Sequence, residues 1–217
     1  MLPSNANVHV DVPGRDGSLF VSSSLRDRFI EVEFFFIGDM RNRRLKAREL
    51  AAWLYSRKRE RLVFDDEPDK FYLAEVSQEI NLEDSFSTSE FTVVFRCEPF
   101  AYGEEQEETF VDDAVTVENE GTIETFPRFI TTFTNAANEW KVSLGNKFVR
   151  VLRSFEVGDV LEVDCSTGKI NINGTNNISY LDWQNSEFFA LLPGENELTV
   201  EPSGIAETTI KYNPRWL

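Results

Sequence analysis

The sequence predicts a mainly β protein, in which an N-terminal α+β domain with antiparallel sheets and one helix precedes a C-terminal antiparallel β-sandwich. Three observations predict this class. The first half contains short runs of period two and one amphipathic stretch. The second half contains short alternating runs separated by Gly, Asn and Ser turn signals. The acidic segment Glu104–Asp113 marks a connection or a solvated edge, which gives expected domains at 1–108 and 109–217.

Two strands are predicted in the first half from alternation. Residues 29–36 place Ile30 on one face and both Phe29 and Phe35 on the other, so each face carries apolar surface. A second alternating run covers 91–97. Surface that is apolar on both faces of a small domain favours burial between subunits.

One helix is predicted from about Arg43 to Ser56. Its apolar positions have helical spacing, and Trp53 widens the apolar face. The basic stretch Arg41–Arg61 surrounds it and leaves two interpretations open. It could contact phosphates, or it could be the solvated face of an amphipathic helix, which the acidic net charge of the chain favours. The members of the predicted apolar face are Ala47, Leu50, Ala51 and Leu54.

The segment Arg61–Tyr72 predicts two strands around a turn. Leu62–Phe64 is apolar, Asp65–Asp69 combines Asp side chains with a proline, and Phe71–Val76 begins a second strand. The carboxylates could bind calcium, but they lack the alternating ligands and central glycine of an EF-hand loop. A turn is the favoured interpretation.

The second half predicts only strands and no helix. Three tryptophans, Trp140, Trp183 and Trp216, allow two interpretations: a platform for stacking sugars, or core residues of the sandwich. The core interpretation is favoured for Trp140 and Trp183. The predicted strands are Phe129–Phe133, Trp140–Leu144, Phe148–Leu152, Val160–Asp164, Lys169–Ile172, Glu187–Leu191, Glu197–Val200 and Thr208–Tyr212.

Composition excludes several classes of protein. The net charge is −16, which opposes tight nonspecific binding of nucleic acid. No apolar run approaches the roughly 18 residues of a membrane-spanning helix, and the first residues lack the layout of a signal peptide. Cys97 and Cys165 are expected to be free, buried thiols of a protein made in a reducing cytosol.

A search for catalytic residues finds no convincing set. The one histidine, His9, has no Cys or Asp spacing around it, so neither a zinc site nor a nucleophile–histidine pair is supported. Phosphate-binding and dinucleotide-binding glycine motifs are absent from the sequence. Carboxylates are too numerous for any pair to be informative. We therefore expect no enzymatic activity and no cofactor.

The chain as a whole resembles the distal tail proteins of siphophages, the phages with long non-contractile tails. The resemblance covers nearly the full length, and its motifs occur in order. They are Val12–Gly17, Arg28–Val32, Leu50–Leu54, Leu62–Pro68 with Phe71-Tyr72, Phe95–Tyr102, Val117–Thr122 with Phe126-Pro127, Gly158–Asp164, Leu192–Leu198 and Tyr212–Leu217.

This resemblance implies a structural protein of the virion tail tip, assembled in the host cytoplasm. It implies a hexameric ring in which N-terminal belt domains enclose a channel and galectin-like C-terminal sandwiches project outward. DNA passes the channel without specific binding. The implied partners are further copies of the chain, the tail tube protein and the tail-associated hydrolase or fibre protein, with the tape measure or a receptor-binding protein as further candidates.

Two departures from the family pattern qualify these implications. Fewer residues precede Val12 than is usual, which predicts a shortened N-terminal strand or arm. No long insertion interrupts the sandwich, so an inserted host-binding module is not expected.

A structural hub is therefore the predicted function, with a carbohydrate-binding module for the host wall and a glycan hydrolase as the alternatives. The predicted assembly-interface residues are Arg43, Arg44, Arg48, Phe29 and Phe35. The basic stretch is expected to meet acidic surface on a neighbouring subunit or tail protein, while carboxylates line the channel.

Overall fold

A computed structural model describes residues 3–35, 43–77, 90–111 and 113–217. The chain forms two compact units, one comprising Met1–Tyr102 with Leu217 and the other Gly103–Trp216. The boundary predicted between residues 108 and 109 falls inside strand β8 (Gln106–Phe110) of the second unit. Each unit has a hydrophobic core of its own.

The first unit contains an antiparallel sheet with the strand order β7-β5-β6-β3, and β4 pairs with β5. Strand β3 therefore ends this sheet. The alternating runs predicted for the first half form β3 and β6, which pair along their whole lengths. The bounds are β3 Arg28–Phe35, β4 Glu60–Phe64, β5 Glu67–Val76, β6 Glu90–Cys97 and β7 Ala101–Gly103.

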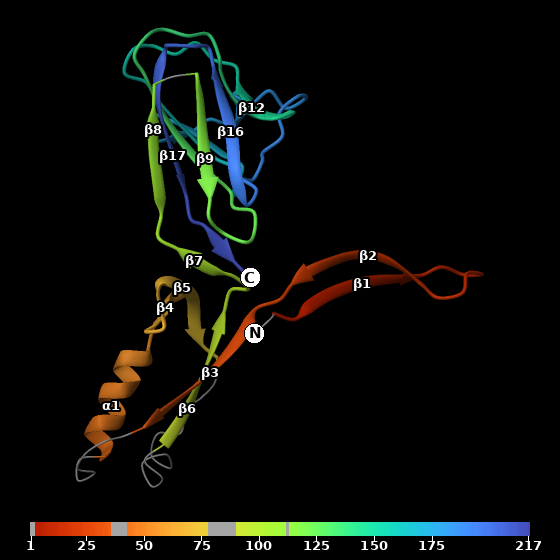
Figure 1. The fold of residues 1–217 in the computed structure, drawn as a ribbon, viewed down its shortest axis with the longest axis vertical. Coiled ribbons are helices and arrows are strands. Elements are labelled where there is room, and N and C mark those ends of the chain that lie inside the picture. Colours follow the sequence, from red (N-terminus) through yellow and green to blue (C-terminus); the bar gives the residue numbers. More distant parts are fainter. Residues whose placement is uncertain (1–2, 36–42, 78–89, 112) are drawn as a thin grey trace. The chain divides into compact units, whose positions relative to one another are not determined.

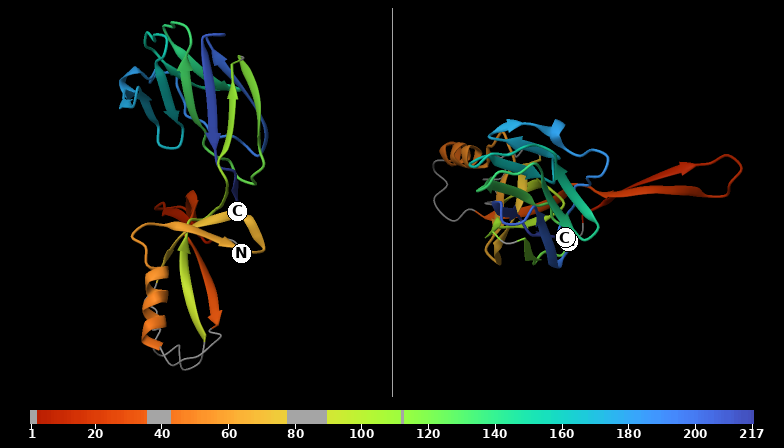
Figure 2. Two further views of the ribbon diagram at one scale, coloured as in Figure 1. Left: turned by 90° about the vertical axis from the view of Figure 1, so that its left-hand side faces the viewer. Right: turned by 90° about the horizontal axis from the view of Figure 1, so that it is seen from above.

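Helix α1 (Arg43–Leu54) covers one face of this sheet (Figures 1 and 2). Leu50 and Leu54 pack against a core that includes Val93 and Phe95 of β6. The helix is two residues shorter than predicted. The predicted apolar face is also partly wrong, because Ala51 is exposed and Trp53 is 64% exposed.

The N-terminal residues form a two-stranded antiparallel hairpin of β1 (Asn5–Asp11) and β2 (Ser18–Leu25). The motif Val12–Gly17 is its turn, and Gly14 and Gly17 have φ angles of 81° and 77°, which glycine adopts readily. The described N-terminal residues thus include a seven-residue strand.

The turn predicted at Asp65–Asp69 is shorter in the structure. Only Asp65 and Asp66 form it, and β5 already begins at Glu67. The pairing of β4 with β5 shifts between Leu62 and Phe64, so Pro68 lies in an irregular stretch of strand. A strand tolerates proline there because the position requires no ladder N–H donor.

The second unit is an antiparallel sandwich of two sheets, as predicted. One sheet has the order β15-β14-β13-β10-β17-β8 and the other β12-β11-β16-β9. The bounds are β9 Ala114–Asn119, β10 Arg128–Phe133, β11 Trp140–Leu144, β12 Lys147–Val151, β13 Val160–Asp164, β14 Lys169–Ile172, β15 Thr175–Asn176, β16 Gly194–Glu201 and β17 Ala206–Tyr212. The short strand β18 (Arg215–Trp216) belongs to neither of these two sheets.

The core between these sheets contains side chains from both of them. Trp140 is fully buried, with its ring centroid 6.1 Å from that of Phe129 and 0% exposure. The core interpretation is confirmed for Trp140 and wrong for Trp183, which is 63% exposed in a turn after Leu181. Trp216 is half-buried.

The strand predicted at Glu187–Leu191 is absent. The amide of Glu187 donates to the carbonyl of Phe148, whereas the amide of Leu191 donates to that of Thr125, so the segment has no single partner strand. Its alternation reflects the burial of Phe189 and Leu191 in the core instead. The acidic segment conversely contains β8, a strand at the edge of its sheet.

The second unit contains one short 3₁₀ helix, Ile178–Tyr180. Among the described residues of the whole chain, no helix is both long and apolar enough to cross a membrane.

Candidate assembly interface

Strand β3 presents an aromatic and acidic surface to solvent. Phe29, Glu31, Glu33 and Phe35 alternate along it and are all exposed, with Phe29 at 54% and Phe35 at 63%. The intervening residues Ile30, Val32 and Phe34 face the core beneath the helix. We call Phe29, Glu31, Glu33 and Phe35 the outer face of β3.

A cluster of ion pairs fixes β3 to its sheet. Asp27, just before the strand, accepts hydrogen bonds from Nε of Arg96 at 2.6 Å and from Arg59 at 3.2 Å. Arg59 also pairs with Glu98 at 3.1 Å. These contacts join the start of β3 to β6 and to the segment before β4.

Helix α1 presents a basic surface on the other side of the same sheet. Arg48 is exposed and lies one helical turn from the exposed apolar residue Leu45, at 56%, whereas Trp53, at 64%, packs edge-on against Phe34 of β3 with ring centroids 5.8 Å apart. Arg43 and Arg44 occupy the first two helical positions, and their side chains lie outside the described residues. No acidic residue stands in the first turn, so positive charge lies at the positive end of the helix dipole.

The predicted interface residues therefore divide between two surfaces. Phe29 and Phe35 belong to the outer face of β3, and Arg48 belongs to the exposed side of α1. The structure does not bring these two groups together within one chain, because the sheet separates the outer face of β3 from the helix.

The hairpin adds an apolar face that sequence reasoning missed. Val10 pairs with Leu19, and Val8 pairs with Ser22 beyond a bulge. Val8, Val10 and Leu19 are 49%, 47% and 42% exposed. The signal was the alternation of valine with polar residues from Val8 to Val12. His9 lies on the opposite side, near Phe20, with its Nδ1 3.4 Å from Ser18 Oγ.

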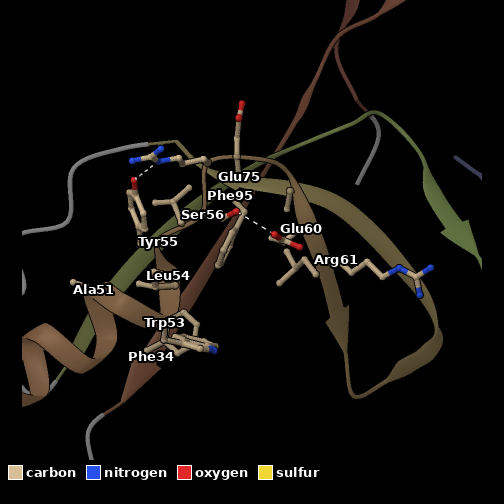
Figure 3. A pocket seen from close by; sticks show the side chains of 14 residues that line it. Phe34, Ala51, Trp53, Leu54, Tyr55, Ser56, Glu60, Arg61, Glu75 and Phe95 are labelled. Carbon is tan, nitrogen blue, oxygen red and sulfur yellow. Dashed lines mark hydrogen bonds between the residues drawn. The ribbon is translucent and has the colours of Figure 1, made fainter.

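A groove also lies between the end of α1 and the sheet (Figure 3). Its volume is about 580 Å³, and Phe34, Leu54 and Phe95 are among its apolar lining residues. The side chain of Ser56 donates to Glu60 at 3.1 Å, and Arg57 donates to the hydroxyl of Tyr55 at 3.0 Å. The polar side chains at the rim thus bond one another.

The two cysteines are free and buried, as predicted. Burial raises the pKa of Cys97 to about 11 and that of Cys165 to about 12. Neither thiol has the low pKa of a reactive cysteine. Within the described ranges, His, Cys, Asp and Glu side chains form no group of three or more that could hold a metal ion.

Comparison with known proteins places this geometry in a family. A family model described as "Phage tail protein RIFT-related domain" matches residues 2–97, and one described as "Siphovirus-type tail component, C-terminal domain" matches residues 120–216. The distal tail protein of Bacillus phage SPP1 is 28% identical over 207 residues, which cover 91% of this chain and 81% of that protein. The chain belongs to the distal tail protein family of siphophages.

The fold of this family member agrees with a solved structure. The crystal structure of the SPP1 Dit protein matches with a TM-score of 0.78 and 24% identity, covering 100% of this chain and 90% of that one. The predicted family and the predicted mainly β fold class are both confirmed. The surfaces described above therefore belong to a phage tail component, and the question becomes which contacts they make.

Proposed function

We propose that the chain is a non-enzymatic hub at the distal end of the tail, where six copies form a closed ring around a channel for DNA. The first unit builds the ring, and the second is a galectin-like sandwich that projects outward from it. The ring joins the tail tube protein to the tail-associated hydrolase or fibre protein. Assembly takes place in the host cytoplasm before the tail is complete.

The exposed apolar surface of the first unit is the observation that carries this proposal. An isolated two-stranded hairpin is marginally stable in water, yet the β1–β2 hairpin exposes its aligned apolar residues Val8, Val10 and Leu19. Phe29 and Phe35 add aromatic surface on β3. Covering such surface by further copies of the chain stabilises both, and rotational closure limits the growth of the assembly.

The related SPP1 Dit protein supports this role, because it is described as a paradigm of the hub adsorption apparatus in phages that infect Gram-positive bacteria. A carbohydrate-binding module acting alone would not need the apolar surface of the first unit. The net charge of −16 per chain keeps DNA phosphates from adhering to the channel.

Mass photometry over a wide range of concentration tests the ring directly. We expect a species of six chains, and negative-stain images of that species should show a closed ring with a central opening. A chain that stays monomeric at every concentration, both alone and with tail tube protein, would contradict the proposal. The variant Val10→Asp with Leu19→Asp should reduce the six-chain species, because it puts charges on the apolar face of the hairpin.

A further inference from the structure

We infer that helix α1 of one copy docks against the outer face of β3 in the next copy, an inference that rests on the proposed ring. A ring built by head-to-tail contacts requires two different, complementary surfaces on each chain. The first unit supplies such a pair, one on each side of a single sheet.

The positions of the two surfaces suit repetition around a ring. Ile30, Val32 and Phe34 of β3 pack on the side that Leu50 and Leu54 of the helix cover. Alternate residues of a strand point to opposite faces, so the outer face of β3 lies on the other side. A helix docked there by a second copy leaves that copy's own outer face free for a third.

The charges of the two surfaces are opposite. Helix α1 contains four basic residues, Arg43, Arg44, Lys46 and Arg48, and one acidic residue, Glu49. Glu31 and Glu33 are exposed, and within the described part of the chain neither has an ion pair. Opposite charges across an interface set its register and exclude wrong partners.

The apolar residues of the two surfaces are also complementary. Phe29 and Phe35 flank the two glutamates of the strand, and the exposed Leu45 lies one turn from Arg48 on the helix. Docking would cover Phe29, Phe35 and Leu45 around a charged centre. Aromatic anchors of this kind supply much of the affinity at protein interfaces.

The start of the helix gives an independent argument. Arg43 and Arg44 stand at its positive end, where cations destabilise a helix and carboxylates stabilise it. Local stability alone favours acidic residues at these positions. A sequence choice that opposes helix stability indicates a function, and an acidic partner surface provides one.

Exchange of the charges tests this contact. The helix variant replaces Arg43, Arg44 and Arg48 by Glu, and the strand variant is Glu31→Lys with Glu33→Lys. Each variant should raise the concentration for half-assembly at least tenfold, as measured by mass photometry, and the combined variant should restore most of the loss. The substitutions at Arg43 and Arg44 favour the helix, so a loss of assembly would not reflect unfolding.

The control matched to the strand variant is Glu195→Lys with Glu197→Lys, which makes that variant's change in net charge on exposed positions of β16 in the second unit. It should leave assembly unchanged. Circular dichroism and melting temperature check that every variant is folded.

The possible outcomes distinguish an error in the proposed helix–strand contact from an error in the proposed ring. If the unmodified chain forms a six-chain ring and either charge variant does so equally well, the contact is wrong while the ring stands. If both variants fail to assemble and the combined variant gains nothing, the two surfaces face different partners, and the contact is again wrong. If the unmodified chain never assembles, the ring itself is overturned.

Discussion

Gly121 lies directly against the backbone of Arg215, which joins two distant motifs of the second unit. The amides of Thr122 and Ile123 both donate to the carbonyl of Arg215, at 2.9 Å and 3.1 Å. A methyl group at Gly121 would collide with that carbonyl oxygen and lie 2.7 Å from the Arg215 amide nitrogen. The motif Tyr212–Leu217 is therefore hydrogen-bonded to the end of the motif Val117–Thr122, and this contact gives both motifs a structural role.

We predict that Gly121→Ala destabilises the protein by about 2–4 kcal/mol, because the backbone of Arg215 and the side chain of Asn119 leave the new methyl group no room. Chemical denaturation followed by fluorescence measures the loss. Gly145→Ala is the comparison: Gly145 has open space around it and a φ of 58°, so backbone strain of about 1 kcal/mol is the expected cost there. Equal losses in the two variants would contradict the packing argument.

Trp140 and Trp183 should respond differently to truncation. Trp140→Ala leaves a large cavity in a fully packed core, and we expect a loss of about 3–5 kcal/mol in unfolding free energy. Trp183→Ala removes an exposed side chain and should change stability by less than about 0.5 kcal/mol. Thermal melts of both variants under the same buffer condition compare the two losses of stability.

The intermediate variant Trp140→Phe refines this prediction. The indole Nε1 of Trp140 is buried and has no hydrogen-bond partner among the described residues. Its removal therefore sacrifices no hydrogen bond, and the cost should be well below that of Trp140→Ala. A phenylalanine variant as unstable as the alanine variant would show that Nε1 has a partner.

The sequence predicted most strands of the second unit because two buried faces impose strict alternation. Trp140–Leu144 and Val160–Asp164 match the observed strands residue for residue. Strand β8 was missed, because it is an edge strand in which four of the five residues are polar and exposed, so the sequence shows no alternation of apolar and polar residues. Trp183 was wrongly predicted to lie in the core, because composition alone cannot distinguish a tryptophan in a turn from one in a core.

The placement of the candidate interface residues followed from the sequence less completely than the fold. The exposure of Phe29 and Phe35 followed from period two, because Ile30 and Val32 determine which face is buried. The relationship between Arg48 and β3 did not follow, since only the packing of Leu50 and Leu54 shows which side of the sheet the helix covers. Sequence patterns locate a face of an element, but not the neighbour of that face.

The buried thiols predict chemical inertness in the folded state. With pKa values raised to about 11 for Cys97 and about 12 for Cys165, little thiolate exists at pH 8. We expect a disulfide reagent to label neither cysteine over minutes in native buffer and to label both after denaturation. Rapid labelling of one native thiol would show that its unit opens locally. Single Cys→Ser variants assign the reactive site.

The last prediction concerns Asp164, which holds the turn between β13 and β14. Its Oδ1 accepts hydrogen bonds from the amide of Ser166 at 2.8 Å and from the amide of Thr167 at 3.2 Å. Its Oδ2 accepts from the hydroxyl of Thr167 at 2.7 Å. Burial raises the pKa of Asp164, but these hydrogen bonds to the charged form outweigh burial, and the net pKa is lowered.

A carboxyl whose pKa is lower in the folded state stabilises that state above its unfolded pKa of about 3.9, and the contribution is lost as pH falls through the folded pKa. Asp164→Ala should therefore cost about 1 kcal/mol at pH 7, and the difference from the unmodified protein should shrink steadily below pH 4. Urea denaturation of both proteins at pH 7, 4 and 3 measures this difference. The control is Glu195→Ala, an exposed carboxylate on β16. If the difference for Asp164→Ala stays constant or grows as pH falls, the charged turn contacts are not the source of the stability.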